Sequence, residues 1–249
     1  MLDLHSHIVP GVDDGAEDGS AAVAIVAAAA ADGVRVIAAT PHVRADFPTT
    51  PEQICDGVHA LQRLVEPRIV RGAEVSLEVA GTLPPEELAA FTLAGSRYLL
   101  VEPPYTGLPL NAGSVLFTLR LAGLIPIIAH PERNPDIQAD PGRLRELVDA
   151  GALAQLTAGA LTGRRGNTAL RTARILLDEG LAHLVAGDAH RPLAPNATMS
   201  AALATTDPAL AEWLGYGVPA AIVADEPIPP RPAVRPRRRR RVLAWRTPA

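Results

Sequence analysis

The chain has 249 residues, of which 48% are hydrophobic, so it can bury a large core and is not a disordered protein. All 23 basic residues are arginine, and 8 of them fall in residues 227–249, which leaves 15 arginines against 27 acidic residues in residues 1–226. This acidic body argues against nucleic-acid binding and suits metal ions, while the single cysteine, Cys55, excludes a disulfide framework and a cysteine-rich zinc site.

Short apolar runs alternate with helical patterns from the N-terminus to about residue 225. The runs predicted to be strands are residues 2–5, 34–39, 68–70, 98–101, 124–129, 153–156 and 181–186. Helices are predicted over 20–32, with Ser20 as a cap and Gly33 as the stop, over 51–65, and around Leu116, Leu147, Leu176 and Leu203. Apolar strands that alternate with helices predict an α/β protein whose parallel strands form an open sheet or a closed barrel.

The pattern stops after about residue 225, and the N-terminus shows no pattern of a targeting signal. Residues 1–226 are predicted to form one domain, and the proline- and arginine-rich residues 227–249 a disordered tail. The tail is either a functionless extension or an electrostatic contact with an acidic partner or a membrane surface. The N-terminus has no signal-peptide pattern, and the alanine-rich residues 21–31 are too few to span a bilayer, so we expect a cytoplasmic protein.

Histidine or carboxylate side chains follow six of the predicted strands. They are His5 and His7, His42, Glu74, Glu102, His130, and Asp188 with His190. Active sites of parallel barrels lie at the carboxyl ends of the strands, where these side chains are expected to meet. Five of the seven histidines occupy such positions, and the other two, His59 and His183, are expected to be structural or surface residues.

The spacing within two of these segments favours metal binding. In extended backbone, residues i and i+2 point the same way, so His5 and His7 can bind one ion together. Asp188 and His190 repeat this spacing and either share an ion or bind adjacent ions. A single pair of this kind is a weak signal, and the prediction depends on their joint occurrence. Imidazole together with carboxylate suits zinc, manganese or iron.

Several of these segments resemble a known family. Residues 3–15, which end in Asp13-Asp14-Gly15, resemble the opening motif of the polymerase and histidinol phosphatase (PHP) superfamily, and more narrowly of its capsule and exopolysaccharide tyrosine-phosphatase branch (CpsB/CapC type). Residues 40–42, 72–75, 129–133 and 188–190 resemble the later motifs of this branch, in the same order. The match covers residue 1 to about residue 215.

The resemblance implies a distorted (β/α)7 TIM-like barrel, the PHP fold, with three divalent metal ions, preferably manganese and otherwise iron or zinc. The first ion would be held by His5, His7, Glu74 and Asp188. The second would be held by Glu74 as a bridge, with Glu102 and His130, and the third by Asp14, His42 and His190. Without the resemblance, the Asp14 segment could equally be an ordinary turn.

The same resemblance implies a metal-dependent protein-tyrosine phosphatase in which a metal-bound hydroxide attacks phosphorus directly. Arg133 would bind the phosphate, and either His42 or His190 would protonate the leaving group. The implied substrate is a tyrosine-phosphorylated protein, namely a bacterial tyrosine kinase of polysaccharide export, so the enzyme would regulate capsule or exopolysaccharide synthesis. Arg191 is expected to be a surface residue.

Three alternatives bear on this prediction. A cysteine phosphatase needs arginine six positions after its cysteine, but that position after Cys55 is Leu61, so this mechanism is rejected. A small-molecule phosphatase of the same superfamily, acting for example on histidinol phosphate, stays open. So does a metal-binding or interaction module without activity, whose working part would be the arginine-rich tail.

Overall fold

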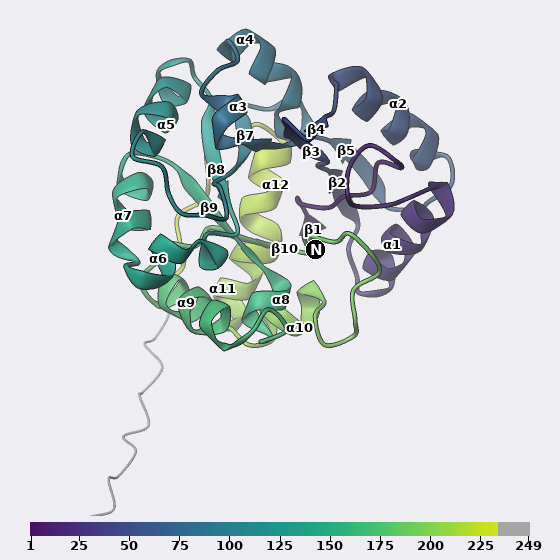
Figure 1. Ribbon diagram of the computed structural model, residues 1–249. Helices are drawn as coiled ribbons and strands as arrows, with labels where there is room; N and C mark the ends of the chain where they lie inside the picture. The colour runs from purple at the N-terminus through teal and green to yellow at the C-terminus, as the bar shows by residue number, and fades with distance from the viewer. Residues whose placement is uncertain (234–249) are drawn as a thin grey trace, which may run out of the picture.

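Parallel strands occupy the centre of the molecule and helices surround them, as Figure 1 shows for a computed structural model that describes residues 1–233. The strands are β1 (Leu2–Asp3), β2 (Val36–Ala39), β3 (His42–Arg44), β4 (Phe47–Pro48), β5 (Arg68–Arg71), β6 (Glu74–Ser76), β7 (Tyr98–Glu102), β8 (Ile125–Ala129), β9 (Leu153–Thr157) and β10 (Leu184–Ala186). Each of the seven predicted runs contains a strand, and β3, β4 and β6 are additional.

The helices lie between and outside these strands. The longer ones are α1 (Gly19–Ala31), α2 (Pro51–Gln62), α5 (Ala112–Leu121), α7 (Gly142–Asp149) and α9 (Asn167–Asp178). The short ones are α3 (Leu77–Ala80), α4 (Pro85–Leu88), α6 (Pro135–Ala139), α8 (Ala158–Leu161), α10 (Met199–Leu203), α11 (Pro208–Glu212) and α12 (Val218–Val223), with single turns η1 (Ala89–Phe91), η2 (Leu93–Gly95), η3 (Pro131–Arg133) and η4 (Trp213–Gly217). Among the described residues, no helix combines the length and hydropathy needed to cross a bilayer.

The strands form two sheets, one in the order β1-β2-β5 and one in the order β10-β9-β8-β7-β6-β3-β4. Every pairing is parallel except that of β3 with β4, which confirms the predicted parallel α/β fold. At two places a strand of the first sheet continues directly into a strand of the second, from β2 through Pro41 into β3 and from β5 into β6. Backbone hydrogen bonds also connect the segments that follow β1 and β10: Asp188 N–H donates to His5 O (2.9 Å) and His7 N–H to Ala189 O (3.0 Å).

Aliphatic side chains fill the core, as the low aromatic content of the sequence requires. At the centres of the strands, Ile37, Leu99, Ile127 and Val185 have no measurable exposure to solvent. Burial of a side chain of this size stabilises the fold by about 1.5–3 kcal/mol. Because residues on both faces of these strands are buried, the sheets are covered on both sides, as the apolar runs predicted.

The helix starts follow ordinary capping chemistry, with one correction to the prediction. The cap of α1 is Asp18 and not Ser20, because the Asp18 carboxylate accepts a hydrogen bond from Ala21 N–H (2.8 Å). At α2, Thr50 and Gln53 form a reciprocal capping box, with Pro51 at the first helical position. Such caps stabilise a helix by about 1 kcal/mol.

The first residues of the predicted tail contact the domain instead of lying free of it. The Trp213 indole N–H donates to Pro229 O (2.9 Å), and the Arg231 guanidinium donates to Ala182 O (2.9 Å) and Leu177 O (2.7 Å). The guanidinium carbon of Arg231 also lies 5.5 Å from the centre of the Trp213 ring. These contacts satisfy carbonyl groups at a helix end and in a loop, so the segment 227–233 is attached to the domain. The rest of the predicted tail, residues 234–249, lies outside the described residues, and the domain boundary stays a prediction.

His183 is a structural residue whose imidazole accepts a hydrogen bond from Ala154 N–H (3.2 Å). Burial and the nearby Arg231 cation lower its pKa to about 4. Between pH 6.5 and about 4, the unfolded chain therefore binds a proton that the folded chain does not, and the free energy of unfolding falls as pH falls. We expect this residue to account for a loss of about 2 kcal/mol between pH 7 and pH 5. His183→Asn keeps an acceptor and should reduce the loss by that amount in urea unfolding; equal losses in both proteins would contradict the assignment.

Candidate metal centre

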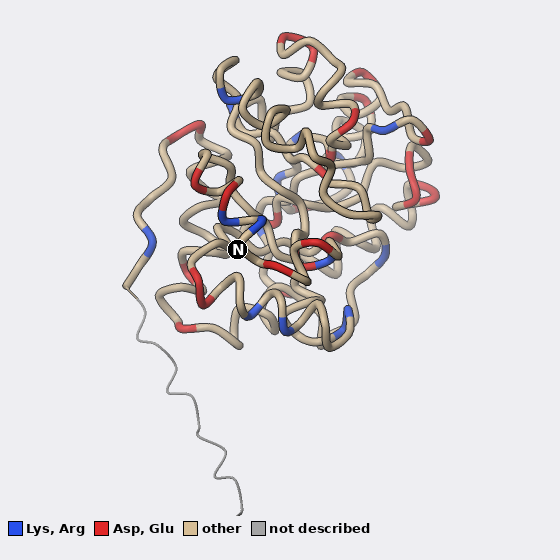
Figure 2. Tube along the Cα trace, turned by 60° about the vertical axis from the view of Figure 1, so that its left-hand side comes forward, with Lys and Arg blue, Asp and Glu red and all other residues tan. Residues whose placement is uncertain are grey.

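Nine predicted ligands come together at the edge of the sheets where the strands end. They are His5, His7, Asp14, His42, Glu74, Glu102, His130, Asp188 and His190. All are buried except Asp14, whose side chain is 49% exposed, and His190, at 25%. Burial of so many ionisable groups is costly unless they pair with one another or bind a metal ion. Figure 2 shows that acidic positions are also spread around the rest of the trace, which fits the acidic body predicted from composition.

The first predicted set surrounds the ends of the His5 and His7 rings. His5 Nε2 and His7 Nε2 are 3.2 Å apart, and Glu74 Oε2 lies 3.3 Å from the first and 3.4 Å from the second. Asp188 Oδ1 lies 3.6 Å from each. The i, i+2 spacing therefore does direct both imidazoles to one point, as the sequence predicted.

The second set centres on Glu74 and Glu102. His130 Nε2 lies 2.8 Å from Glu74 Oε1 and 3.6 Å from Glu102 Oε1. His42 Nδ1 approaches the same two carboxylates, at 3.0 Å from Glu74 Oε2 and 3.5 Å from Glu102 Oε2. His42 therefore faces the second set with Nδ1. Its other ring nitrogen, Nε2, faces the third set.

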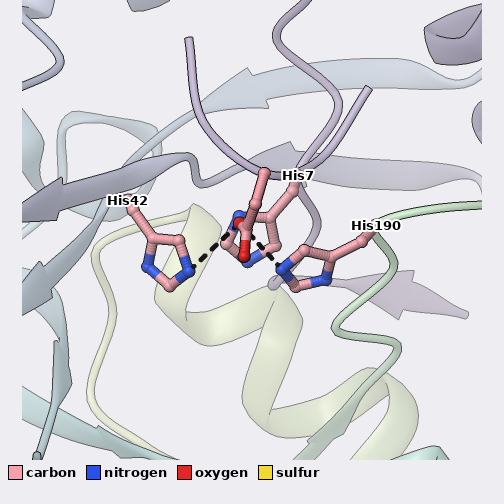
Figure 3. Close-up of side chains that lie close together, drawn as sticks. His7, His42 and His190 are labelled. Carbon is pink, nitrogen blue, oxygen red and sulfur yellow. Dashed lines mark ion pairs between the residues drawn. The ribbon is translucent and has the colours of Figure 1, made fainter. Parts of the chain in front are cut away.

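The third set lies at the solvent side of the cluster and is drawn in Figure 3. The rings of His7, His42 and His190 face one another there, and the dashed ion pairs join Asp14 Oδ1 to His42 Nε2 (3.5 Å) and His190 Nε2 (3.3 Å). The His7 and His190 rings stack with centroids 3.9 Å apart. One ligand atom from each of these four residues fits within 4.8 Å of the others, so His7 joins the three residues predicted for this set.

Two residues that the sequence did not single out as site residues orient the histidines. Asp13 Oδ2 lies 2.7 Å from His7 Nδ1 and also accepts from His42 N–H (3.0 Å), and Gln155 Oε1 lies 2.8 Å from His5 Nδ1. Such partners fix which ring nitrogen faces the cluster, as is usual around metal-bound imidazoles. Asp13 lies within the predicted Asp-Asp-Gly segment, but its role depends on the loop conformation; Gln155 lies inside an apolar strand, where its polarity is the only signal in the sequence.

The backbone at the centre is strained at two of these residues. His130 (φ 35°) and Asp188 (φ 51°) adopt left-handed conformations, which are costly for residues other than glycine. Strain of this kind costs about 1–3 kcal/mol and tends to cluster at functional sites. The surrounding strands hold both side chains toward the cluster.

The donor set fits divalent cations. Three buried atoms that face the cluster, His42 Nδ1, Glu74 Oε2 and Glu102 Oε1, make no hydrogen bond of good geometry among the described residues, although the first two lie 3.0 Å apart. Although burial disfavours its charge, the carboxylates of Glu74 and Asp188 raise the pKa of His5 to about 9. Burial opposes ionisation of Glu74 as well, yet the neighbouring imidazoles, His5 first, hold its pKa well below the usual range. The pocket thus strongly favours positive charge among its carboxylates, which a bound metal ion supplies.

Arginine residues border the cluster. Arg133 Nη1 lies 3.0 Å from Asp188 Oδ2, and its Nη2 donates to the Tyr105 hydroxyl (3.2 Å). Arg165 Nη2 also lies 3.0 Å from Asp188 Oδ2 and was not predicted. Arg44 Nη1 lies 3.4 Å from Glu102 Oε2. Arg191 is exposed, as expected of a surface residue.

A cavity of about 530 Å³ lies next to the cluster, between the β3–β4 hairpin and helices α3 and α4. Its lining is largely apolar and includes Val43, Pro48, Val79, Leu83 and Phe91. Arg44 lies between the cavity and the cluster, because it lines the cavity and pairs with Glu102 of the cluster. Groups attached to a ligand at the cluster can therefore extend onto an apolar surface.

Fold and site together define an α/β protein with a candidate multi-metal centre at the carboxyl edge of its parallel strands. The family model described as "Capsular polysaccharide synthesis, CpsB/CapC" matches residues 1–212. The chain belongs to the CpsB/CapC family, which confirms the resemblance seen in its motifs.

Relatives and a solved structure agree with this membership. The chain is 36% identical over 200 residues to tyrosine-protein phosphatase YwqE of Bacillus subtilis (strain 168), covering 76% of this chain and 77% of that protein. It is 31% identical over 203 residues to tyrosine-protein phosphatase CpsB of Streptococcus pneumoniae, covering 76% and 83%. A solved structure from work on these two "unique metal-dependent tyrosine phosphatases" superposes with a TM-score of 0.80 at 29% identity, covering 94% of this chain and 100% of that one.

Proposed function

We propose that this protein is a metal-dependent protein-tyrosine phosphatase that acts in the control of capsule or exopolysaccharide synthesis. The observation that carries the proposal is the convergence of five histidines and four carboxylates at one edge of the fold, in a chain of the CpsB/CapC family. Relatives named tyrosine-protein phosphatases support this activity over a small-molecule phosphatase or an inactive binding module.

Three divalent ions, preferably manganese, would occupy the three sets of ligands described above. His5, His7, Glu74 and Asp188 would hold the first, Glu74, Glu102 and His130 the second, and Asp14, His42 and His190 the third. Ions bound in this way lower the pKa of coordinated water and neutralise the charge of a phosphate ester. Asp13 and Gln155 would keep the ring nitrogens of His7 and His5 directed at the ions.

The remaining residues of the site would bind the ester and assist departure of its alcohol. Arg133 would bind phosphate oxygens through its planar fork of donors, while Tyr105 orients its guanidinium. Of the two histidines predicted to protonate the leaving group, His190 is the more exposed, at 25% of its side chain against 3% for His42, and it would donate a proton only while it is not bound to the third ion. The reaction would not pass through a cysteinyl-phosphate intermediate, since the described site contains no cysteine; Cys55 lies in α2.

We further propose that the two sheets together form the distorted seven-stranded barrel of the PHP fold. Supporting this are the two places where strands of one sheet continue into the other, and the backbone hydrogen bonds between the segments following β1 and β10. In that arrangement all six ligand-bearing segments would lie on a single rim, the usual position of active sites in such barrels.

The proposed substrate is a tyrosine-phosphorylated protein, specifically a bacterial tyrosine kinase of polysaccharide export. The apolar cavity beside the cluster supports a polypeptide, because it provides a surface for side chains that neighbour the phosphotyrosine. The arginine-rich residues beyond 233 would contact an acidic partner or a membrane surface, a role that concerns residues outside the described part of the chain.

A comparison of substrates tests this proposal. With manganese present, we expect the purified protein to hydrolyse phosphotyrosine peptides with a kcat/KM at least about 100-fold higher than for histidinol phosphate, a difference of about 3 kcal/mol in transition-state binding. Phosphate release measured over a range of substrate concentrations gives both constants, and phosphoserine peptides of the same sequence serve as the control. A preference for histidinol phosphate would assign the small-molecule activity instead, and no turnover of any phosphate ester would leave only a binding module.

A further inference from the structure

The two oxygens of the Asp188 carboxylate face different groups. Oδ1 is turned to the imidazoles and lies 3.6 Å from His5 Nε2, His7 Nε2 and His190 Nδ1. Oδ2 is turned away from them and accepts hydrogen bonds from Arg133 Nη1 and Arg165 Nη2, each at 3.0 Å. Two guanidinium cations therefore meet on one oxygen of a single carboxylate.

The loop between α8 and α9 presents the second of these arginines in a defined conformation. Gly163 (φ 82°) and Gly166 (φ 92°) give the loop left-handed turns on either side, and Arg165 N–H donates to Gly159 O (3.1 Å). The aliphatic part of the Arg165 side chain packs against Gly159, where a Cβ atom would come within 3.3 Å of Arg165 Cγ. A side chain at position 159 would push the Arg165 side chain aside by a few tenths of an ångström.

Exposure and donor count leave Arg165 available to a ligand. Its side chain is 40% exposed, against 23% for Arg133, so its guanidinium borders both solvent and the cluster. Among the described residues, the guanidinium donates only to Asp188, which uses one of its five N–H donors. Arg133, in contrast, is engaged by Asp188 and Tyr105 together.

We propose that Arg165 is a second phosphate-binding residue, which together with Arg133 binds the non-bridging oxygens of the substrate's phosphate group next to the ligand cluster. The inference rests on the proposed phosphatase function and adds a residue to it. A dianionic phosphate monoester matches two forked cations better than one, because each guanidinium can offer parallel N–H donors to a pair of oxygens. Asp188 would hold both arginines at the correct spacing through the oxygen that faces away from the histidines.

The test compares Arg165→Ala with Arg164→Ala, a neighbouring exposed arginine that makes no ion pair with the residues the structure describes. With para-nitrophenyl phosphate as substrate, Arg165→Ala should lower kcat/KM by about 10- to 100-fold, the usual effect of losing one or two charged hydrogen bonds. Arg165→Lys should recover part of this loss because it keeps the charge but not the fork. The inhibition constant of inorganic phosphate should rise about tenfold in Arg165→Ala, with unchanged metal content by elemental analysis.

Several outcomes would overturn the inference. One is a kcat/KM for Arg165→Ala equal to that of Arg164→Ala. Another is loss of bound metal, or an unchanged inhibition constant of phosphate despite lower activity, because either result would make Arg165 a support for Asp188 alone. Failure of the wild-type protein to hydrolyse any phosphate ester would count against the proposed function itself, and binding of inorganic phosphate by calorimetry would then still test Arg165 separately.

Discussion

Replacing both His5 and His7 by alanine is expected to lower kcat/KM by about 10³-fold or more, because the variant loses two imidazoles that face one point of the cluster. Bound metal should fall in parallel, since Glu74 and Asp188 alone would remain of the first predicted set. Phosphatase assays together with elemental analysis of the same samples measure both effects. Retained activity with full metal content would remove the basis of the proposed site.

The controls for this experiment separate chemistry from folding. His59→Ala changes an exposed histidine of α2 and should leave activity and metal content unchanged. A His5→Gln, His7→Gln variant preserves most of the buried volume and should lose activity as the alanine variant does. Thermal unfolding in the presence of a chelator compares the folded stability of all variants without any contribution of bound metal.

Glu74→Gln replaces one carboxylate oxygen with an amide nitrogen. It is expected to lower kcat/KM about as much as the replacement of His5 and His7 by alanine. The Glu74 carboxylate approaches four imidazoles, with His42 and His130 at 3.0 and 2.8 Å and His5 and His7 at 3.3 and 3.4 Å. The Glu74 carboxylate faces the first two predicted sets at once. Its replacement by a neutral amide should therefore reduce the number of ions bound by more than one and lower kcat/KM by about 10³-fold.

Asp14→Asn is the matched comparison, since it makes the same chemical change in a half-exposed residue that belongs to the third set alone. We expect it to lose at most one ion and about tenfold in kcat/KM, the lower end of what ligand-shell substitutions cost. Metal stoichiometry by elemental analysis distinguishes the variants. If Glu74→Gln bound as many ions as the wild type, the first two sets would not share this carboxylate, and the proposed bridging role would be wrong.

Local patterns in the chain were sufficient to predict seven of the ten strands and all of the longer helices that the structure describes. The seven apolar runs contain strands because aliphatic stretches of this length, between helical segments, are stable only when buried in a covered parallel sheet. Element ends were less predictable: Asp18, and not Ser20, caps α1, since two polar residues compete there for the same free N–H groups. The short strands β3 and β6 are not predicted because each begins at a polar residue, His42 or Glu74, just after an apolar run that already forms a strand of its own.

By itself, the sequence determined the fold class and most of the residues at the carboxyl edge, because apolar periodicity, residue type and i, i+2 spacing are local properties of the chain. The family and the ligand role of Asp14 came from the resemblance of its motifs, and the family is confirmed by the family model. Only the tertiary structure decided which atoms face one another. It placed His7 beside His190 and His42, assigned Asp13 and Gln155 to orienting the imidazoles, and brought Arg165 to Asp188. The reason is that these contacts join residues whose approach depends on loop paths and strand register, and neither is encoded in any short segment.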